Sequence, residues 1–413
     1  MFIGIAFYIL LLVCYFYPAS TIFYYLGISV RPLPHWIWIS SFVLYLSGYY
    51  LIPMNYTRPS DFASLYLFLS VIAPINILPF LLSEAPYTSL IMLPLATNVS
   101  FIVFEIVRTR KLAVKKHYGK VVYTLLFASL CIGSIYVLML TGANFSFDIM
   151  DYAGIYERRL SARASNIPWI VIVFITQVSE AMIPFGVAIG ILYKKRALLL
   201  LSLFSLLVFF SYNGKKHLIF TIIAIAFMIY IIINKRNDYK LWIVSAICTI
   251  FALALVEWFK FETVLLTAFI VHRAFITIAH GSLAYWDWFN KNPFAYMTDS
   301  NWNLFIDKVY QMSTPSLIGA EYFSGPDENV NVNIWFTGFG DFGIIGMIIT
   351  SVFAALVLRY IDKHSIGKEK LAIIVCFIIG GIWTNSGLFT SFISHGVITL
   401  ILFFYYFQSE TNK

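Results

Sequence analysis

Apolar runs follow one another through almost the whole of this chain, each about as long as a membrane-crossing helix. A helix needs roughly 20 apolar residues to cross the hydrocarbon core of a bilayer. Only 12% of the 413 residues are charged and 60% are hydrophobic, whereas about 25% of the residues of a soluble domain are charged. Water would not tolerate the exposed apolar surface of such a chain. The sequence therefore predicts an all-α transmembrane helix bundle that forms a single domain over residues 1–413.

The apolar runs predict twelve spans. The run over 1–17 follows no basic segment and contains no small-residue cleavage site, so we interpret it as a first span and not as a signal peptide. The twelve spans are expected near residues 1–17, 35–53, 62–84, 87–107, 121–142, 168–193, 197–212, 217–234, 241–259, 334–358, 371–390 and 392–408.

Lysines and arginines are distributed unevenly between the two sets of span ends. Most of the 28 lysines and arginines lie at one of these two sets of span ends, which includes the especially basic segment 108–120. The basic-rich side of a membrane protein is normally the cytoplasmic side, so both termini are predicted to be cytoplasmic. Two long connections, 143–167 and 260–333, are then external. We expect the specific work of the protein on the outer face, with short or re-entrant helices in 260–333.

The composition also argues against several classes of function. The net charge is +8, but the basic residues sit in short clusters between apolar runs, which favours a topology signal over nucleic-acid binding. No Gly-rich nucleotide-binding loop is present, so ATP-driven chemistry is not expected. The four cysteines lie inside apolar runs without metal-ligand spacing. We therefore expect no metal and no cofactor.

Basic residues on the predicted external segments are the first candidates for chemistry. Arg158 and Arg159 come shortly before a span, and guanidinium groups bind phosphate oxygens bidentately. Lys215 and Lys216 follow an Asn-Gly turn at the start of a helix, where the N-terminus already favours anions. For the arginines the alternative is a solvated loop helix. For the lysines the alternatives are anchoring to lipid headgroups and a topology in which this turn lies on the inner side.

The long connection contains an arginine and an aromatic cluster. Arg273 lies within the apolar stretch 263–279, and an arginine there is costly in lipid unless it faces a protein interior or a water-filled cavity. We expect a re-entrant or interfacial helix that directs Arg273 toward the site. Tyr285 and Asp287 belong to the aromatic stretch 285–289, which offers stacking surfaces and a carboxylate for a sugar ring. The alternative is an interfacial aromatic belt.

Further polar candidates lie toward the end of the long connection. Glu321, Asn331 and Asn333 supply carboxylate and amide groups, and Asp341 lies among glycines at the start of a predicted span. Small residues let helices approach closely, and an acid at that depth is functional by default. A structural role for Asp341, as a cap or an ion-pair partner, is the alternative.

Three polar residues lie inside other predicted spans. Glu180 and Gln177 are candidates for lining a cavity. His395 is either a base or an interior histidine with a satisfied hydrogen bond, and we favour the second interpretation.

The segment 272–346 contains five short motifs: Arg273-Ala-Phe, Tyr285-Trp-Asp-Trp-Phe with Asn292-Pro293, Pro315-Ser-Leu-Ile-Gly319, Asn331-Val-Asn333, and Gly340-Asp-Phe-Gly343 with Gly346. In these motifs the segment resembles the Wzy-type oligosaccharide repeat-unit polymerases of bacterial surface polysaccharides. The rest of the chain resembles them in layout only, and where relatives often have an arginine in the basic turn this chain has lysines, which keep the charge but lack the planar fork.

The resemblance implies a glycosyltransferase with a fold similar to the integral-membrane GT-C enzymes. It would act on the outer face of the bacterial inner membrane. The donor would be a growing glycan on undecaprenyl pyrophosphate, and the acceptor a single lipid-linked repeat unit. A chain-length-regulating co-polymerase is an implied partner. The alternatives are a lipid-linked oligosaccharide flippase or transporter and an O-antigen ligase.

Within this resemblance the candidate residues take roles. The leaving pyrophosphate needs positive charge, which side chains supply without a metal, and the acceptor hydroxyl needs a general base. Glu321 is the first choice of base, followed by His280 or Asp341. The pyrophosphate would contact Arg158, Arg159, Lys215, Lys216 and Arg273, and the sugars would contact Tyr285, Asp287, Asn331 and Asn333.

Overall fold

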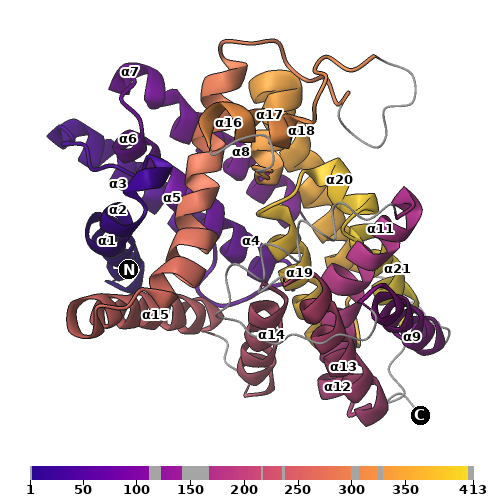
Figure 1. Cartoon of the computed structure of the whole chain (residues 1–413). Coiled ribbons are helices and arrows are strands. Elements are labelled where there is room, and N and C mark those ends of the chain that lie inside the picture. The colour runs from indigo at the N-terminus through magenta and orange to yellow at the C-terminus, as the bar shows by residue number, and fades with distance from the viewer. Residues whose placement is uncertain are drawn as a thin grey trace.

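The computed structural model describes residues 2–110, 122–141, 167–214, 217–234, 238–298, 307–323 and 329–407 (Figure 1). All regular secondary structure in these ranges is helical. The prediction of an all-α chain is therefore confirmed for the part of the sequence that the structure describes.

The helices of the N-terminal half follow the predicted apolar runs. Several runs are divided by a short π-helical or 3₁₀ turn (η), and in three of them a proline lies in or beside the division. These helices are α1 (Phe2–Cys14), η1 (Tyr15–Ala19), α2 (Ser20–Ile22), η2 (Tyr24–Leu26), α3 (His35–Leu51), α4 (Asp61–Leu67), η3 (Phe68–Ile72), α5 (Ala73–Ile75), α6 (Leu78–Leu82), α7 (Tyr87–Leu90), α8 (Met92–Thr109), α9 (Val122–Thr141), α11 (Trp169–Gln177), η4 (Val178–Met182) and α12 (Ile183–Leu192).

The C-terminal half also contains the helices of the long connection. In Figure 1, α16, α17 and α18 lie together at one end of the molecule, with α20 beside them. These helices are α13 (Arg196–Asn213), α14 (His217–Ile233), α15 (Tyr239–Phe261), η5 (Thr267–Ile276), α16 (Thr277–Phe289), α17 (Thr314–Tyr322), α18 (Ile334–Lys363), α19 (Glu369–Trp383), α20 (Leu388–Ile393) and α21 (Val397–Tyr406).

Seven helices in the described ranges are long and apolar enough to cross a membrane, as expected of an integral membrane protein. The predicted spans at 197–212 and 217–234 correspond to α13 and α14, which are shorter apolar helices. The seven are Phe2–Ile22, Asp61–Leu82, Tyr87–Thr109, Val122–Thr141, Trp169–Leu192, Tyr239–Phe261 and Ile334–Lys363.

A buried cluster of charged side chains joins the ends of α4, α8 and α18. The Arg108 guanidinium contacts Asp61 Oδ1 at 2.7 Å and Glu105 Oε2 at 2.5 Å, and the three side chains are almost completely buried. Arg108 also donates to Ser60 Oγ (2.7 Å), which in turn donates to Asp362 Oδ2 (2.6 Å). A buried charge is tolerated only when it is paired or hydrogen-bonded. Arg108 pairs with Asp61 and Glu105, and Asp362 is hydrogen-bonded by Ser60.

Two buried lysines bind the C-terminal ends of other helices. Lys240 Nζ donates to the backbone oxygen of Tyr49 (2.6 Å) in the last turn of α3. Lys368 Nζ donates to the backbone oxygens of Phe404 and Tyr405 in the last turn of α21. A cation stabilises this end of a helix because its carbonyl groups have no partners within the helix. Both lysines belong to the set that predicts the cytoplasmic side.

The helix α18 is broken near its start. Phe342 (φ −144°) and Gly343 (φ 63°, ψ −150°) have non-helical backbone angles. They divide α18 into a first arm, 334–341, and a second arm, 344–363. The second arm has 20 residues and is about 30 Å long at 1.5 Å per residue, which is enough to cross a bilayer.

The two arms of α18 are in direct backbone contact. A Cβ atom on Gly346 would lie 1.9 Å from the carbonyl oxygen of Gly338, and a Cβ atom on Gly338 would lie 2.5 Å from Thr350 Oγ1. In an unbroken helix, residues eight positions apart are separated by about 12 Å along the axis. The first arm therefore folds back on the second, and the glycines make this close approach possible.

Asn333 starts the first arm. Its side chain is completely buried, with Oδ1 accepting from the backbone nitrogens of Trp335 (3.1 Å) and Phe336 (3.3 Å). Its Nδ2 donates to Ser282 Oγ on α16 (3.0 Å). Asn333 thus acts as an N-cap that also ties α18 to α16.

We expect Asn333→Ala to lower the free energy of unfolding by about 1–2 kcal/mol, because an N-cap acceptor is lost and the buried Ser282 loses a donor. Thermal unfolding of the purified protein in detergent measures the change. Asn333→Asp is the matched control, since it keeps the acceptor for the helix N-terminus and should be closer to the parent. Equal stability of the alanine variant and the parent would contradict the capping role.

Candidate functional site

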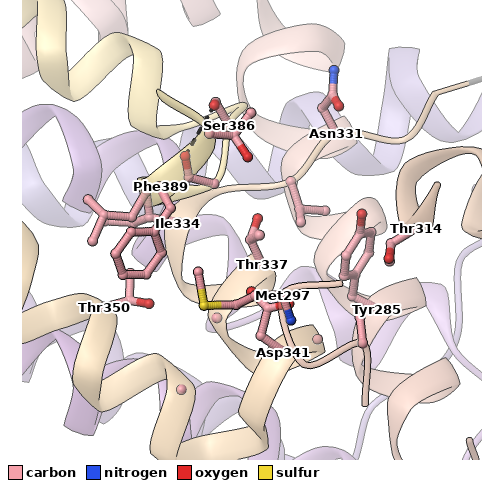
Figure 2. Close-up of a pocket in the computed structure, with 18 of the residues that line it drawn as sticks. Tyr285, Met297, Thr314, Asn331, Ile334, Thr337, Asp341, Thr350, Ser386 and Phe389 are labelled. Atoms are coloured by element: carbon pink, nitrogen blue, oxygen red, sulfur yellow. Dashed lines mark hydrogen bonds between the residues drawn. The ribbon is translucent and has the colours of Figure 1, made fainter. Parts of the chain in front are cut away.

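A cavity of about 270 Å³ lies against the first arm of α18. Its lining comes from α16, the turn 295–297, the start of α17, the segment 331–350 and the segment 385–395. Figure 2 shows Tyr285 and Thr314 on one side of the cavity, Ser386 and Phe389 on another, and Thr337 and Asp341 between them. Segments that are distant in the sequence therefore meet at one concave surface, the usual form of a small-molecule site.

Three of the predicted site residues line this cavity. Tyr285 on α16 is buried, Asn331 precedes the first arm of α18 and is exposed, and Asp341 ends that arm. They supply an aromatic ring with a hydroxyl, an amide and a carboxylate. Such groups on a mostly apolar wall orient a ligand that carries hydroxyl groups.

A strained turn holds Asp341 in place. The backbone nitrogen of Met297 donates to Asp341 Oδ1 (2.9 Å), and that of Ala295 donates to the backbone oxygen of Gly340 (2.8 Å). Tyr296 (φ 52°) and Met297 (φ 61°) both adopt the left-handed conformation, which is uncommon without glycine. Such strain costs about 1–3 kcal/mol per residue and is concentrated at functional sites. The position of this carboxylate is therefore closely specified by the fold.

Glycines let the walls of the cavity approach one another. A Cβ atom on Gly387 would lie 2.6 Å from Thr337 Cγ2, and one on Gly340 would lie 2.9 Å from Phe289 Cε2. Each contact is closer than real Cβ atoms allow. The first arm of α18 consequently packs against both α16 and the segment 385–390.

Sequence reasoning missed the contribution of the segment 385–390 to the cavity. Thr384, Asn385 and Ser386 interrupt a run predicted as a continuous span, and this polar triplet was the available signal. His395 also lines the cavity, and its Nδ1 lies 2.5 Å from Glu180 Oε2. The sequence favours a satisfied interior histidine, and the structure gives this histidine both a partner and a place on the cavity wall.

Asp287 and Tyr322 form a second polar group between α16 and α17. Asp287 Oδ2 accepts from Tyr322 Oη (2.6 Å) and from Lys291 Nζ (2.7 Å). Burial and the adjacent Asp287 carboxylate raise the pKa of the Tyr322 hydroxyl. Glu321 is next to Tyr322 in the chain and is exposed. Neither Asp287 nor Glu321 lines the cavity.

His280 and Arg273 also lie away from the cavity lining. The His280 ring packs 4.7 Å from the Phe323 ring, and burial lowers the pKa of His280 to about 4. A histidine with such a pKa is neutral at pH 7 but is a weak base. Arg273 is exposed on η5, the helical segment that leads directly into α16.

The remaining predicted phosphate contacts, Arg158, Arg159, Lys215 and Lys216, lie outside the described residues. Among the described residues the cavity lining contains one carboxylate, that of Asp341, one histidine, and no lysine or arginine. The part of the site that the structure describes is therefore suited to uncharged hydroxyl-bearing groups rather than to a pyrophosphate.

Within the described ranges, no group of three or more histidine, cysteine, aspartate or glutamate side chains is arranged to hold a metal ion. Comparisons of the chain with protein families, curated proteins and solved structures found no match. What the chain does is therefore inferred from the cavity and the residues around it.

Proposed function

We propose that this chain polymerises lipid-linked oligosaccharide repeat units of a bacterial surface polysaccharide. A hydroxyl group on the acceptor repeat unit attacks the anomeric carbon of the growing glycan, and undecaprenyl pyrophosphate leaves. The glycan is thereby transferred to the new unit. The chain is a metal-independent glycosyltransferase in this proposal.

The observation that carries the proposal is the composition of the cavity. It brings Tyr285 of α16 together with Asn331 and Asp341 of the segment 331–350 and adds the hydroxyls of Thr314 and Thr337. Hydroxyl, amide and carboxylate groups around an aromatic ring match the hydroxyls and the apolar ring face of a sugar. We assign this cavity to a sugar of the acceptor repeat unit.

The pyrophosphate would bind outside this cavity. Arg273 is exposed on η5, and α16, which continues from η5, carries Tyr285 into the cavity. One continuous helical segment therefore carries both the Arg273 guanidinium group and, further along its axis, Tyr285, the proposed sugar contact. We propose that Arg273 stabilises the charge of the departing pyrophosphate together with Arg158, Arg159, Lys215 and Lys216.

The proposal includes a topology of about twelve spans and a GT-C-like fold in the inner membrane. Helix ends that we assign to the cytoplasm contact one another, which supports placing them on the same side of the membrane. Arg108 meets Asp61, Lys240 meets the end of α3, and Lys368 meets the end of α21. The cavity would open on the external face, where a chain-length-regulating co-polymerase is the proposed partner.

We expect Arg273→Ala to abolish elongation of lipid-linked repeat units by the purified protein in detergent, because the leaving pyrophosphate loses a bidentate partner. Arg273→Lys keeps the charge without the fork and should retain part of the activity. Lys308→Ala, which removes another exposed cation of the 260–333 connection, is the matched control and should elongate normally. Unfolding temperature and abundance should not change in any of the three variants.

The same assay separates the alternatives. Elongation in detergent, where there are no compartments to cross, excludes a protein that only transports lipid-linked glycans. A ligase would not lengthen a lipid-linked glycan, and cells without it would accumulate polymer on the lipid carrier. Cells without a polymerase would instead display single repeats. A purified protein that joins no repeat units would contradict the proposed function.

A further inference from the structure

His395 lies on the wall of the cavity and pairs with Glu180, although 215 residues separate the two in the sequence. The side chain of His395 is 24% exposed and that of Glu180 is 13% exposed. Glu180 lies within Trp169–Leu192, a segment long and apolar enough to cross a membrane. An acid in such a segment is expensive, and its presence points to a function. A π-helical turn, which frequently marks a functional site, carries this acid.

Hydrogen bonds and a close glycine contact on either side of the pair hold His395 next to Glu180. Gln177 Nε2 donates to the backbone oxygen of Ile393 (2.6 Å), and Thr399 Oγ1 donates to Gln177 Oε1 (2.8 Å). Gly396 follows His395 directly and has the left-handed conformation (φ 79°). It allows this part of the chain to approach η4, since a Cβ atom on residue 396 would lie 2.8 Å from Ala181 Cβ. The segment that carries His395 is therefore held against the helix that carries Glu180.

The geometry also distinguishes the two ring nitrogens of His395. Nδ1 is the atom that faces Glu180 Oε2. A carboxylate in this position favours the tautomer with its proton on Nδ1 and stabilises the imidazolium that forms when Nε2 accepts a proton. Nε2 is then the atom with a lone pair for the ligand. The same arrangement of carboxylate and imidazole serves general-base catalysis on unrelated folds.

We propose that His395 is the general base of the glycosyl transfer and that Glu180 is its positioning residue, an inference that rests on the proposed function. His395 Nε2 takes the proton of the acceptor hydroxyl as its oxygen forms a bond to the donor anomeric carbon. The bond from that carbon to the pyrophosphate breaks, and its electron pair leaves with the pyrophosphate. The proton on the imidazolium is released to water in the next step.

This assignment replaces the bases expected from the sequence. Glu321 and His280 do not line the cavity, and Asp341 Oδ1 accepts a hydrogen bond from the backbone of Met297. His395 lines the cavity and has a carboxylate on Nδ1, an arrangement that orients a histidine base in other enzymes.

The test uses the full-length protein in detergent with lipid-linked donor and acceptor. We expect His395→Ala to lower kcat about 10²-fold or more, the contribution of a general base, with little change in KM for the acceptor. Added imidazole should restore part of the rate. Glu180→Gln should cause a smaller loss and move the acid limb of the pH–rate profile to lower pH. His35→Ala, which removes an exposed histidine at the start of α3, is the matched control and should behave as the parent.

His395→Gln keeps a polar side chain and serves if the alanine variant does not fold. A folded glutamine or alanine variant that elongates at close to the parental rate overturns the assignment of the base and leaves the polymerase proposal standing. Loss of activity without imidazole rescue, and with an unchanged pH profile in Glu180→Gln, also overturns it. A parental protein that does not elongate overturns both proposals at once.

Discussion

Replacing Arg108 with methionine should cost the folded state about 3–5 kcal/mol, because the change leaves the carboxylates of Asp61 and Glu105 buried without their cation. A loss of this size is a large part of the total stability of a typical protein. We expect little folded protein in the membrane, and a markedly lower unfolding temperature for whatever can be purified. Thermal unfolding in detergent and the amount of protein in membranes measure both effects.

Arg110→Met is the matched control for this prediction. Arg110 lies two residues further along the chain and is exposed, so the same substitution there should change stability by no more than a few tenths of a kcal/mol. Combining Arg108→Met with Glu105→Gln removes one of the unpaired charges and should recover part of the loss. Equal unfolding temperatures for the two single methionine variants would mean that the Arg108 cluster does not hold α4 and α8 together.

Replacing Gly346 with alanine should force the two arms of α18 apart. The new Cβ atom would lie 1.9 Å from the carbonyl oxygen of Gly338, and a backbone atom cannot move aside as a flexible side chain can. Overpacking of this kind typically costs about 1–3 kcal/mol of folding stability. Because the contact is with a backbone atom, we expect a cost near the top of this range. Because the first arm carries Asp341, elongation should fall together with the unfolding temperature.

Gly381→Ala is the control for the glycine variant. Gly381 is on α19, and the nearest atoms to a new Cβ, those of Tyr66, are 3.9 Å away, an ordinary van der Waals distance. Alanine favours a helix more than glycine does, so this variant should be as stable as the parent or slightly more stable. A Gly346→Ala protein that unfolds at the parental temperature would show that the arms are not in contact.

Most of the helix positions could be predicted from the sequence. The apolar runs at 62–84, 87–107 and 168–193 correspond closely to Asp61–Leu82, Tyr87–Thr109 and Trp169–Leu192. The reason is that a bilayer leaves the backbone no hydrogen-bond partners outside its own helix, so a long apolar run has one structure available to it. The break in α18 was not predicted, because an apolar run looks the same whether it crosses once or folds back.

The candidate site was only partly predictable. Tyr285, Asn331 and Asp341 were named from their chemistry, and they meet at the cavity. Asn333 was named for the same reason, but its amide caps a helix. Residue chemistry alone does not tell these cases apart, since an amide that caps a helix and an amide that binds a sugar make the same kinds of hydrogen bond.

The sequence by itself determined the helical class and where most helices run, since those follow from apolar length and the need of each backbone group for a partner. The tertiary structure decided which polar side chains meet. It paired His395 with Glu180 and enclosed Arg108 among carboxylates. Such pairings join residues that are far apart in the chain, or bury residues that are near one another in it. They depend on how the helices pack in three dimensions. No local pattern of residues encodes that packing.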